Sequence, residues 1–204
     1  MKYIDFYNNF KKFPIITLAD IRSLAQNFDR RRLSEWQERG YIRKLANNFY
    51  IFSDKEINEN NLNIIANKLY QPSYLSLEYA LSYYSLIPET VYWLTSVSTR
   101  KTNKIEIDIA NFSYRKIKKN LFFGYTLKRI NNNDVYFKIA EPEKAILDFL
   151  YLRKDIKDKD SISELRISGS IFREKININK LKKYLKIFGS KTMNKKVEIL
   201  NSIL

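Results

Sequence analysis

The order of periodic segments at the start of this chain restricts its fold more than any other feature. Residues 3–12 and 18–28 carry apolar side chains at helical spacing, and a third helical stretch follows at residues 30–39. Two strand-like runs, 41–45 and 49–52, flank an Ala-Asn-Asn segment that suits a tight turn, because Asn tolerates a positive φ. Three helices followed by a β-hairpin is the order of a winged helix-turn-helix, and the second and third helices are joined by a short turn, as that motif requires.

Residues that favour helix ends stand at the expected boundaries. Thr17 and Asp20 occupy the N-cap and N3 positions of the second helix, which is a capping box with Asp in place of Glu. Asp29 is expected to cap the third helix, and Gly40 suits the position after its last turn. The apolar residues expected on the buried face of the second helix are Leu18, Ile21, Leu24, Ala25 and Phe28.

The rest of the sequence predicts a second, mixed domain. The polar stretch SDKEINENNLN places a boundary near residues 55–62, so we assign residues 1–56 to the winged helix and residues 57–204 to a C-terminal domain. Strand-like runs fill about residues 90–139 of that domain, with a hairpin turn at 131–134. The expected fold class is therefore α+β: an N-terminal winged helix-turn-helix, then a mixed α/β domain with a largely antiparallel sheet, then a helical C-terminal tail.

The charge balance favours a polyanionic partner. Lys and Arg number 37 against 22 Asp and Glu, a formal net charge of +15, and arginine is concentrated in residues 30–43. The excess is nevertheless spread along the chain, so a generally basic composition, rich in Lys, Asn and Ile, is the alternative. No basic and apolar leader opens the sequence and no apolar run reaches 18 residues, so we expect a cytoplasmic protein with no membrane partner.

The sequence contains neither Cys nor His. This excludes thiolate chemistry, His-based acid–base and triad catalysis, and most zinc sites. We therefore expect a protein that is not an enzyme and has no catalytic residue, no cofactor and no metal ligand.

The third helix is the predicted recognition element. Leu33 and Trp36 share the side that would pack on the first two helices, while Arg31 and Ser34 point outward. In the major groove Arg pairs with guanine through two hydrogen bonds, and Ser contacts bases or phosphates. The hairpin would add phosphate contacts. The candidate DNA-binding residues are Arg30, Arg31, Arg32, Ser34, Arg39, Arg43, Lys44, Asn47 and Asn48.

The same helix could instead be only a solvated charged surface. Arg31 and Arg39 each stand four residues from Glu35, the spacing of helical ion pairs. Glu35 and Glu38 also lie on the outward side and would repel phosphates. A related alternative is a protein–protein adaptor in which the winged helix is vestigial, and such a protein would show no salt-dependent DNA binding.

A second alternative is an enzyme: a metal-dependent nuclease that the winged helix delivers to nucleic acid. Glu106 and Asp108 alternate on one expected strand, and Lys128 lies on a later one. Acidic residues and a Lys near strand ends hold a divalent ion in such enzymes. This interpretation requires the three side chains to converge.

Four blocks of the sequence occur in a distinctive order and spacing: residues 72–89, 95–102, 112–124 and 139–152. They follow the segments ITLADIRSL and RLSEWQERGYIRKLANNFYIF, which have the form of a winged helix. Together, over about residues 14–152, these blocks resemble the AbiE-type antitoxin family of type IV toxin–antitoxin, or abortive-infection, systems.

The resemblance implies an antitoxin and transcriptional autoregulator. Such antitoxins bind inverted repeats in their own promoter through the N-terminal domain and repress the operon. Their C-terminal domain opposes a nucleotidyltransferase-like toxin without a stable complex, in defence against phages. Two segments depart from the family pattern: Ser85 stands where Gly is frequent, and the hairpin tip has Asn47 and Asn48 where a basic residue and Gly are common.

Overall fold

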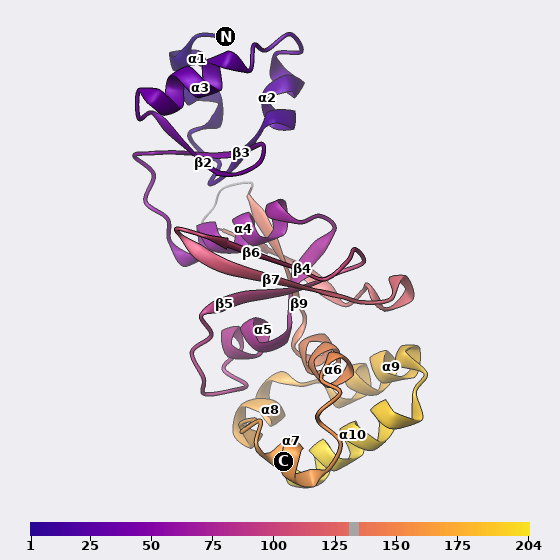
Figure 1. Ribbon diagram of the computed structural model, residues 1–204. Helices are drawn as coiled ribbons and strands as arrows, with labels where there is room; N and C mark the ends of the chain where they lie inside the picture. The colour runs from indigo at the N-terminus through magenta and orange to yellow at the C-terminus, as the bar shows by residue number, and fades with distance from the viewer. Residues whose placement is uncertain (131–134) are drawn as a thin grey trace.

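The computed structural model describes residues 1–130 and 135–204, and within these ranges the chain is a mixed α+β protein with ten helices and two sheets. Three helices and a small sheet occupy one end of an elongated molecule, and a six-stranded sheet occupies its middle (Figure 1). Helices α7 to α10 gather at the other end, next to the C-terminus. The turn predicted at 131–134 lies outside the described residues.

The first 52 residues contain all three expected helices and both hairpin strands. The small sheet is antiparallel with the order β1-β3-β2, and its two-residue strand β1 was not predicted. Its elements are α1 Tyr3–Phe10, β1 Ile16–Thr17, α2 Leu18–Leu24, α3 Arg31–Glu38, β2 Ile42–Ala46 and β3 Phe49–Phe52.

The signals predicted at Thr17 and Gly40 act as expected, whereas the N-cap residue of α3 is Arg30 and not Asp29. The Thr17 hydroxyl accepts the Asp20 N–H at 3.0 Å, and the Asp20 carboxylate accepts the Thr17 N–H at 2.9 Å, which completes the capping box. Asp29 accepts the N–H of Arg31 at 3.0 Å and so satisfies a free donor at the start of α3. Gly40 has φ +71° after α3, and Asn48 has φ +66° in the hairpin turn.

Helix α2 is shorter than the apolar spacing predicted. It ends at Leu24, whose side chain is 58% exposed, so the expectation that Leu24 lies on the buried face is wrong. Ala25 already has the non-helical φ of −139°, and Phe28 reaches the core from the loop that follows. The polar pair at 26–27 includes Asn, which competes for backbone hydrogen bonds outside helices and favours this early end.

The second part of the chain is built on a six-stranded sheet with the order β6-β7-β5-β4-β9-β8. Three neighbouring pairs are antiparallel, while β5–β7 and β4–β9 are parallel, so the sheet is mixed rather than largely antiparallel. The central strand β4 has only three residues, too few to show a period of two, and was not predicted. The strands are β4 Ser73–Leu75, β5 Trp93–Ser98, β6 Asn103–Ile107, β7 Ala110–Lys116, β8 Tyr125–Arg129 and β9 Tyr136–Ala140.

Helices cover both faces of this sheet. Helix α4 lies on one face, where the Tyr114 hydroxyl of β7 donates to the Ala66 carbonyl at 2.8 Å, and α5 and α6 lie on the other (Figure 1). The helices are α4 Glu59–Leu69, α5 Leu77–Tyr83, α6 Pro142–Leu152, α7 Lys159–Ser163, α8 Gly169–Lys175, α9 Ile178–Phe188 and α10 Lys191–Ile203, with a 3-10 turn at Lys119–Leu121.

The hairpin of β2 and β3 lies between two hydrophobic clusters. Tyr50 belongs to the cluster that also contains Trp36 and the first helices. Its neighbour Ile51, together with Ile15 and Leu45, belongs to the cluster of the large sheet. Because successive side chains of a strand point to opposite faces, the hairpin packs against the N-terminal helices on one side and the second part of the chain on the other.

Candidate nucleic-acid interface

The inward side of α3 is fixed by aromatic packing. Leu33 and Trp36 are 1% and 2% exposed, as the helical wheel predicted. The Trp36 ring centroid lies 4.6 Å from that of Phe6 in α1 and 5.8 Å from that of Phe28. Burying a large aromatic side chain on this scale stabilises by roughly 1.5–3 kcal/mol, which holds α3 in one rotational setting.

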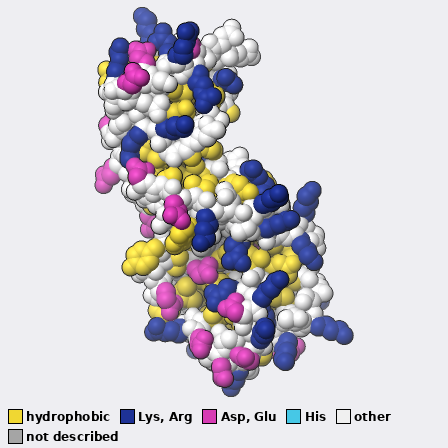
Figure 2. All heavy atoms as spheres, in the orientation of Figure 1, with side chains coloured by type: hydrophobic (Ala, Val, Ile, Leu, Met, Phe, Trp, Pro, Cys, Tyr) yellow, Lys and Arg dark blue, Asp and Glu magenta, His cyan; other side chains and the backbone are white. Residues whose placement is uncertain are grey.

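The outward side of α3 presents cations at its N-terminal end. Arg30, Arg32 and Ser34 are exposed, and their side chains form no hydrogen bond or ion pair with any residue the structure describes. Figure 1 shows α3 at the end of the molecule remote from the large sheet, and Figure 2 shows Lys and Arg side chains with a few acidic ones over that end. The surface is therefore accessible and mainly basic.

Arg31 is exposed but is not free. Its guanidinium forms an ion pair of 2.9 Å with Asp29, while 92% of its side chain remains exposed. The Arg31 guanidinium and the Arg31 backbone N–H both donate hydrogen bonds to the Asp29 carboxylate. These bonds hold the pKa of the Asp29 carboxyl below its ordinary value. The expected Arg31–Glu35 pair is absent, whereas the Arg39–Glu35 pair is present at 2.9 Å.

The hairpin residues face a different environment. The Arg43 guanidinium lies 2.6 Å from the carboxylate of Asp108, in the turn between β6 and β7. Asn48 uses its backbone carbonyl to accept the Leu18 N–H at 3.2 Å, so its conformation serves the start of α2. Lys44 and Asn47 are exposed. The structure thus separates the nine predicted residues into a group at the start of α3, Arg39 at its end, and a hairpin group of which Arg43 contacts the large sheet.

A second ion pair links the two parts of the chain. Lys68 of α4 lies 3.2 Å from Asp20 in the first turn of α2. Burial acts to raise the pKa of the Asp20 carboxyl, but hydrogen bonds with Thr17 and the Lys68 ammonium outweigh it, so the pKa lies below its ordinary value. Together with the Arg43 pair, this contact joins the N-terminal elements to the second part of the chain.

The residues of the nuclease interpretation do not come together. Glu106 lies on β6 and Lys128 on β8, the two opposite edges of the sheet, five strand spacings or roughly 24 Å apart. Asp108, near Glu106, is occupied by Arg43. In residues 1–130 and 135–204 no three acidic side chains are grouped closely enough to hold a metal ion.

The most buried charges belong to a network that sequence reasoning missed. Lys144 and Asp148, one turn apart on α6, form an ion pair with both side chains 0% exposed. The hydroxyls of Tyr74 and Ser76 each donate to Asp148 at 2.9 Å, and the Lys144 ammonium donates to Tyr74 at 2.9 Å. Burial raises the pKa of Asp148 and lowers that of Lys144. A Lys and an Asp four residues apart within an apolar run were the available signal.

Comparison of the sequence with models of known protein families finds no match, and comparison with curated proteins finds none. None of the helices in the described ranges combines the length and apolar content that crossing a bilayer demands. The arrangement of the site therefore carries the functional argument.

Proposed function

We propose that this chain is a DNA-binding protein whose residues 1–56 form a winged helix-turn-helix, with α3 as the helix that enters the major groove. One observation carries the proposal. Arg30, Arg32 and Ser34 project, exposed and without a partner among the described residues, from the N-terminal end of a helix whose opposite side is held in place by Leu33 and Trp36. That is the end of a recognition helix that meets base edges.

The proposed DNA contacts come from α3 and from the hairpin. Arg30 and Arg32 are available for phosphates or guanine edges. Arg31 joins them when a DNA group replaces Asp29 as its partner. Lys44 adds a phosphate contact from the hairpin.

The hairpin serves mainly to position α3. It lies between the two hydrophobic clusters, and Arg43 on β2 is held by Asp108. Because Arg43 already has Asp108 as its partner, we do not place it among the DNA contacts. Asn47, at the exposed tip, remains a candidate contact.

We further propose that the protein is a cytoplasmic antitoxin and autorepressor of a type IV toxin–antitoxin system, without catalysis of its own. The support is the resemblance to AbiE-type antitoxins and the place of its blocks. Residues 72–89 supply β4 and α5, and residues 139–152 supply the end of β9 and all of α6, which are neighbours around the buried Lys144 network. The C-terminal domain opposes a nucleotidyltransferase-like toxin.

Two experiments test these statements separately. The first titrates the protein onto the DNA upstream of its own gene and onto a scrambled fragment, over a series of salt concentrations. The upstream fragment binds more tightly, and log affinity falls with log salt by about 0.9 per phosphate contact. Equal affinity for both fragments would exclude operator recognition.

The second experiment concerns the toxin. The protein is co-expressed with the product of an adjacent nucleotidyltransferase-like reading frame. Restored growth supports the antitoxin assignment, and continued growth arrest contradicts it while leaving the DNA-binding proposal intact.

A further inference from the structure

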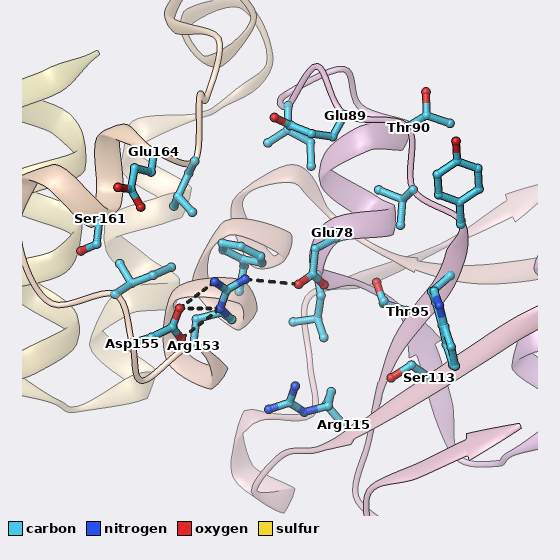
Figure 3. A pocket seen from close by; sticks show the side chains of 18 of the residues that line it. Glu78, Glu89, Thr90, Thr95, Ser113, Arg115, Arg153, Asp155, Ser161 and Glu164 are labelled. Atoms are coloured by element: carbon cyan, nitrogen blue, oxygen red, sulfur yellow. Dashed lines mark hydrogen bonds and ion pairs between the residues drawn. The ribbon is translucent and has the colours of Figure 1, made fainter.

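A cleft of about 660 Å³ lies beside the large sheet, between the exposed face of β5 to β7 and the helices α5, α6 and α7. Its size is that of a small-ligand site. Figure 3 shows polar side chains entering it from both walls, with Arg115 on the sheet side and Arg153 directed toward Glu78 on the helix side.

The sheet-side wall combines an aromatic ring with cations. Lys104 on β6 is directly opposite Ser113 on β7, and Arg115 is two residues further along the same face. The Lys104 ammonium lies 5.0 Å from the centroid of the half-buried Trp93 ring. Arg115 is exposed and has no hydrogen-bond or ion-pair partner in the described ranges of the chain. In the strand register Trp93 is opposite Asn111, four residues before Arg115, so the ring and the unpaired guanidinium are separated by roughly 13 Å along the strands. This spacing suits an extended ligand that has both an anionic and a planar part.

The helix-side wall carries carboxylates that are largely neutralised. Arg153 pairs with Asp155 at 2.6 Å and with Glu78 at 3.7 Å, and its hydrogen bond lowers the pKa of Asp155 to about 2. Glu89 pairs with Arg166 at 3.6 Å. Glu164 keeps a carboxylate without a partner in the described residues, so it is available to accept hydrogen bonds from a ligand.

The cleft leads into a strongly basic hollow. Arg115 also lines an adjoining space of about 380 Å³, between the end of β7 and the end of α6. Four of its seven lining residues are basic and none is acidic: they are Arg115, Lys116, Ile117, Lys118, Tyr151, Leu152 and Lys154. An anion that extends past Arg115 therefore meets three further cations.

We propose that the cleft and the hollow together bind a nucleoside polyphosphate, with its base on Trp93 and its phosphates at Arg115 and the lysines of the hollow. The base replaces the Lys104 ammonium on the ring, and this ammonium then turns to a phosphate. Ser113 and Glu164 offer hydrogen bonds to the sugar or base. The site shares no lining residue with α3.

Tryptophan fluorescence gives a direct readout, because the chain has only two tryptophans and Trp36 is 2% exposed. The full-length protein is titrated with ATP, GTP, CTP and UTP, with adenosine, and with tripolyphosphate. At least one nucleoside triphosphate quenches Trp93 saturably and binds more tightly than either adenosine or tripolyphosphate. Absence of saturable binding by calorimetry, or equal affinity for tripolyphosphate, would overturn the proposal.

The matched variants are Arg115→Ala and Arg22→Ala. Arg22, on α2, is exposed and far from the cleft in sequence, and its removal lowers the net charge by the same amount. Arg115→Ala weakens nucleotide binding by at least about tenfold, the scale of one lost charge-assisted contact, whereas Arg22→Ala leaves it unchanged. Equal effects of the two variants would show a nonspecific charge effect and refute the site. Thermal unfolding of both variants checks that each is folded.

Discussion

Arg31 is held by Asp29 in the free protein. The Arg31 Nε lies 3.1 and 3.0 Å from the two carboxylate oxygens, and one of these oxygens also accepts the Arg31 N–H at 3.0 Å. Asp29 therefore performs two tasks: it satisfies a donor at the start of α3 and it neutralises one of the three consecutive arginines. A DNA group that binds Arg31 must compete with this carboxylate.

Asp29→Asn separates the two tasks, because the amide oxygen still accepts the backbone N–H while the charge is removed. We expect operator affinity at low salt to rise by up to about fivefold, the scale of an exposed ion pair. Fluorescence anisotropy with labelled operator DNA measures this. Weaker binding by the variant would show that Asp29 helps α3 to bind DNA rather than restraining Arg31.

Arg43→Ala tests the role of the hairpin. Its guanidinium is paired with Asp108, so we expect operator affinity to change by less than about twofold, and the free energy of unfolding by less than about 1 kcal/mol. Lys44→Ala, on the same strand, is the comparison. It should weaken operator binding and reduce the slope of log affinity against log salt concentration by about 0.9. A loss with Arg43→Ala as large as that with Arg30→Ala would place Arg43 on the DNA.

The buried ion pair on α6 predicts an asymmetric response to substitution. Asp148→Ala leaves the Lys144 ammonium buried without its counter-ion and should lower the free energy of unfolding by roughly 3–5 kcal/mol. The double variant Lys144→Met/Asp148→Leu removes both charges and should recover most of that loss. Urea denaturation provides the values. A double variant as unstable as the single one would mean that Tyr74 and Ser76 depend on the charged pair for their positions.

The free energy of unfolding should fall at acidic pH because the Asp20 carboxylate becomes protonated. Its folded-state pKa lies below the ordinary value, so the carboxylate stabilises the fold at pH values above about 4, and this contribution is lost as pH falls further. Between about pH 5 and pH 3 the free energy of unfolding should decline less steeply in Asp20→Asn than in the unsubstituted protein. Asp160→Asn, at an exposed position without a charged partner in the described residues, is the control. If the free energy of unfolding declined with pH equally steeply in Asp20→Asn and in the unsubstituted protein, the lowered pKa of Asp20 would be contradicted.

Local signals in the sequence predicted the N-terminal elements well. The Thr17–Asp20 capping box, Gly40 after α3 and Asn48 in the hairpin turn each act within a few residues, so a single sequence contains what determines them. The burial of Leu33 and Trp36 followed from helical spacing alone.

Features that depend on distant parts of the chain escaped prediction. The parallel pair β4–β9 arises because β4 enters the sheet beside β9, and the three residues of β4 carry no detectable period. The parallel pair β5–β7 arises because β6 lies at the edge and leaves β7 next to β5. Arg43 looked like a DNA contact because nothing in the sequence indicates that Asp108, 65 positions later, lies beside it. For the same reason Lys144 and Asp148 gave no sign of Tyr74, whose hydroxyl contacts both.

The most direct test of operator recognition by α3 compares two triple variants that remove the same charge. One replaces the arginines at the start of α3, Arg30, Arg31 and Arg32, by Ala. The other replaces exposed lysines of α9 by Ala: Lys182, Lys183 and Lys186. At about 150 mM salt the α3 variant should lose at least about a hundredfold in operator affinity, while the α9 variant stays within about threefold of the unsubstituted protein. Unchanged operator affinity in the α3 variant, or an equal loss in both, would contradict the assignment of α3 as the recognition helix.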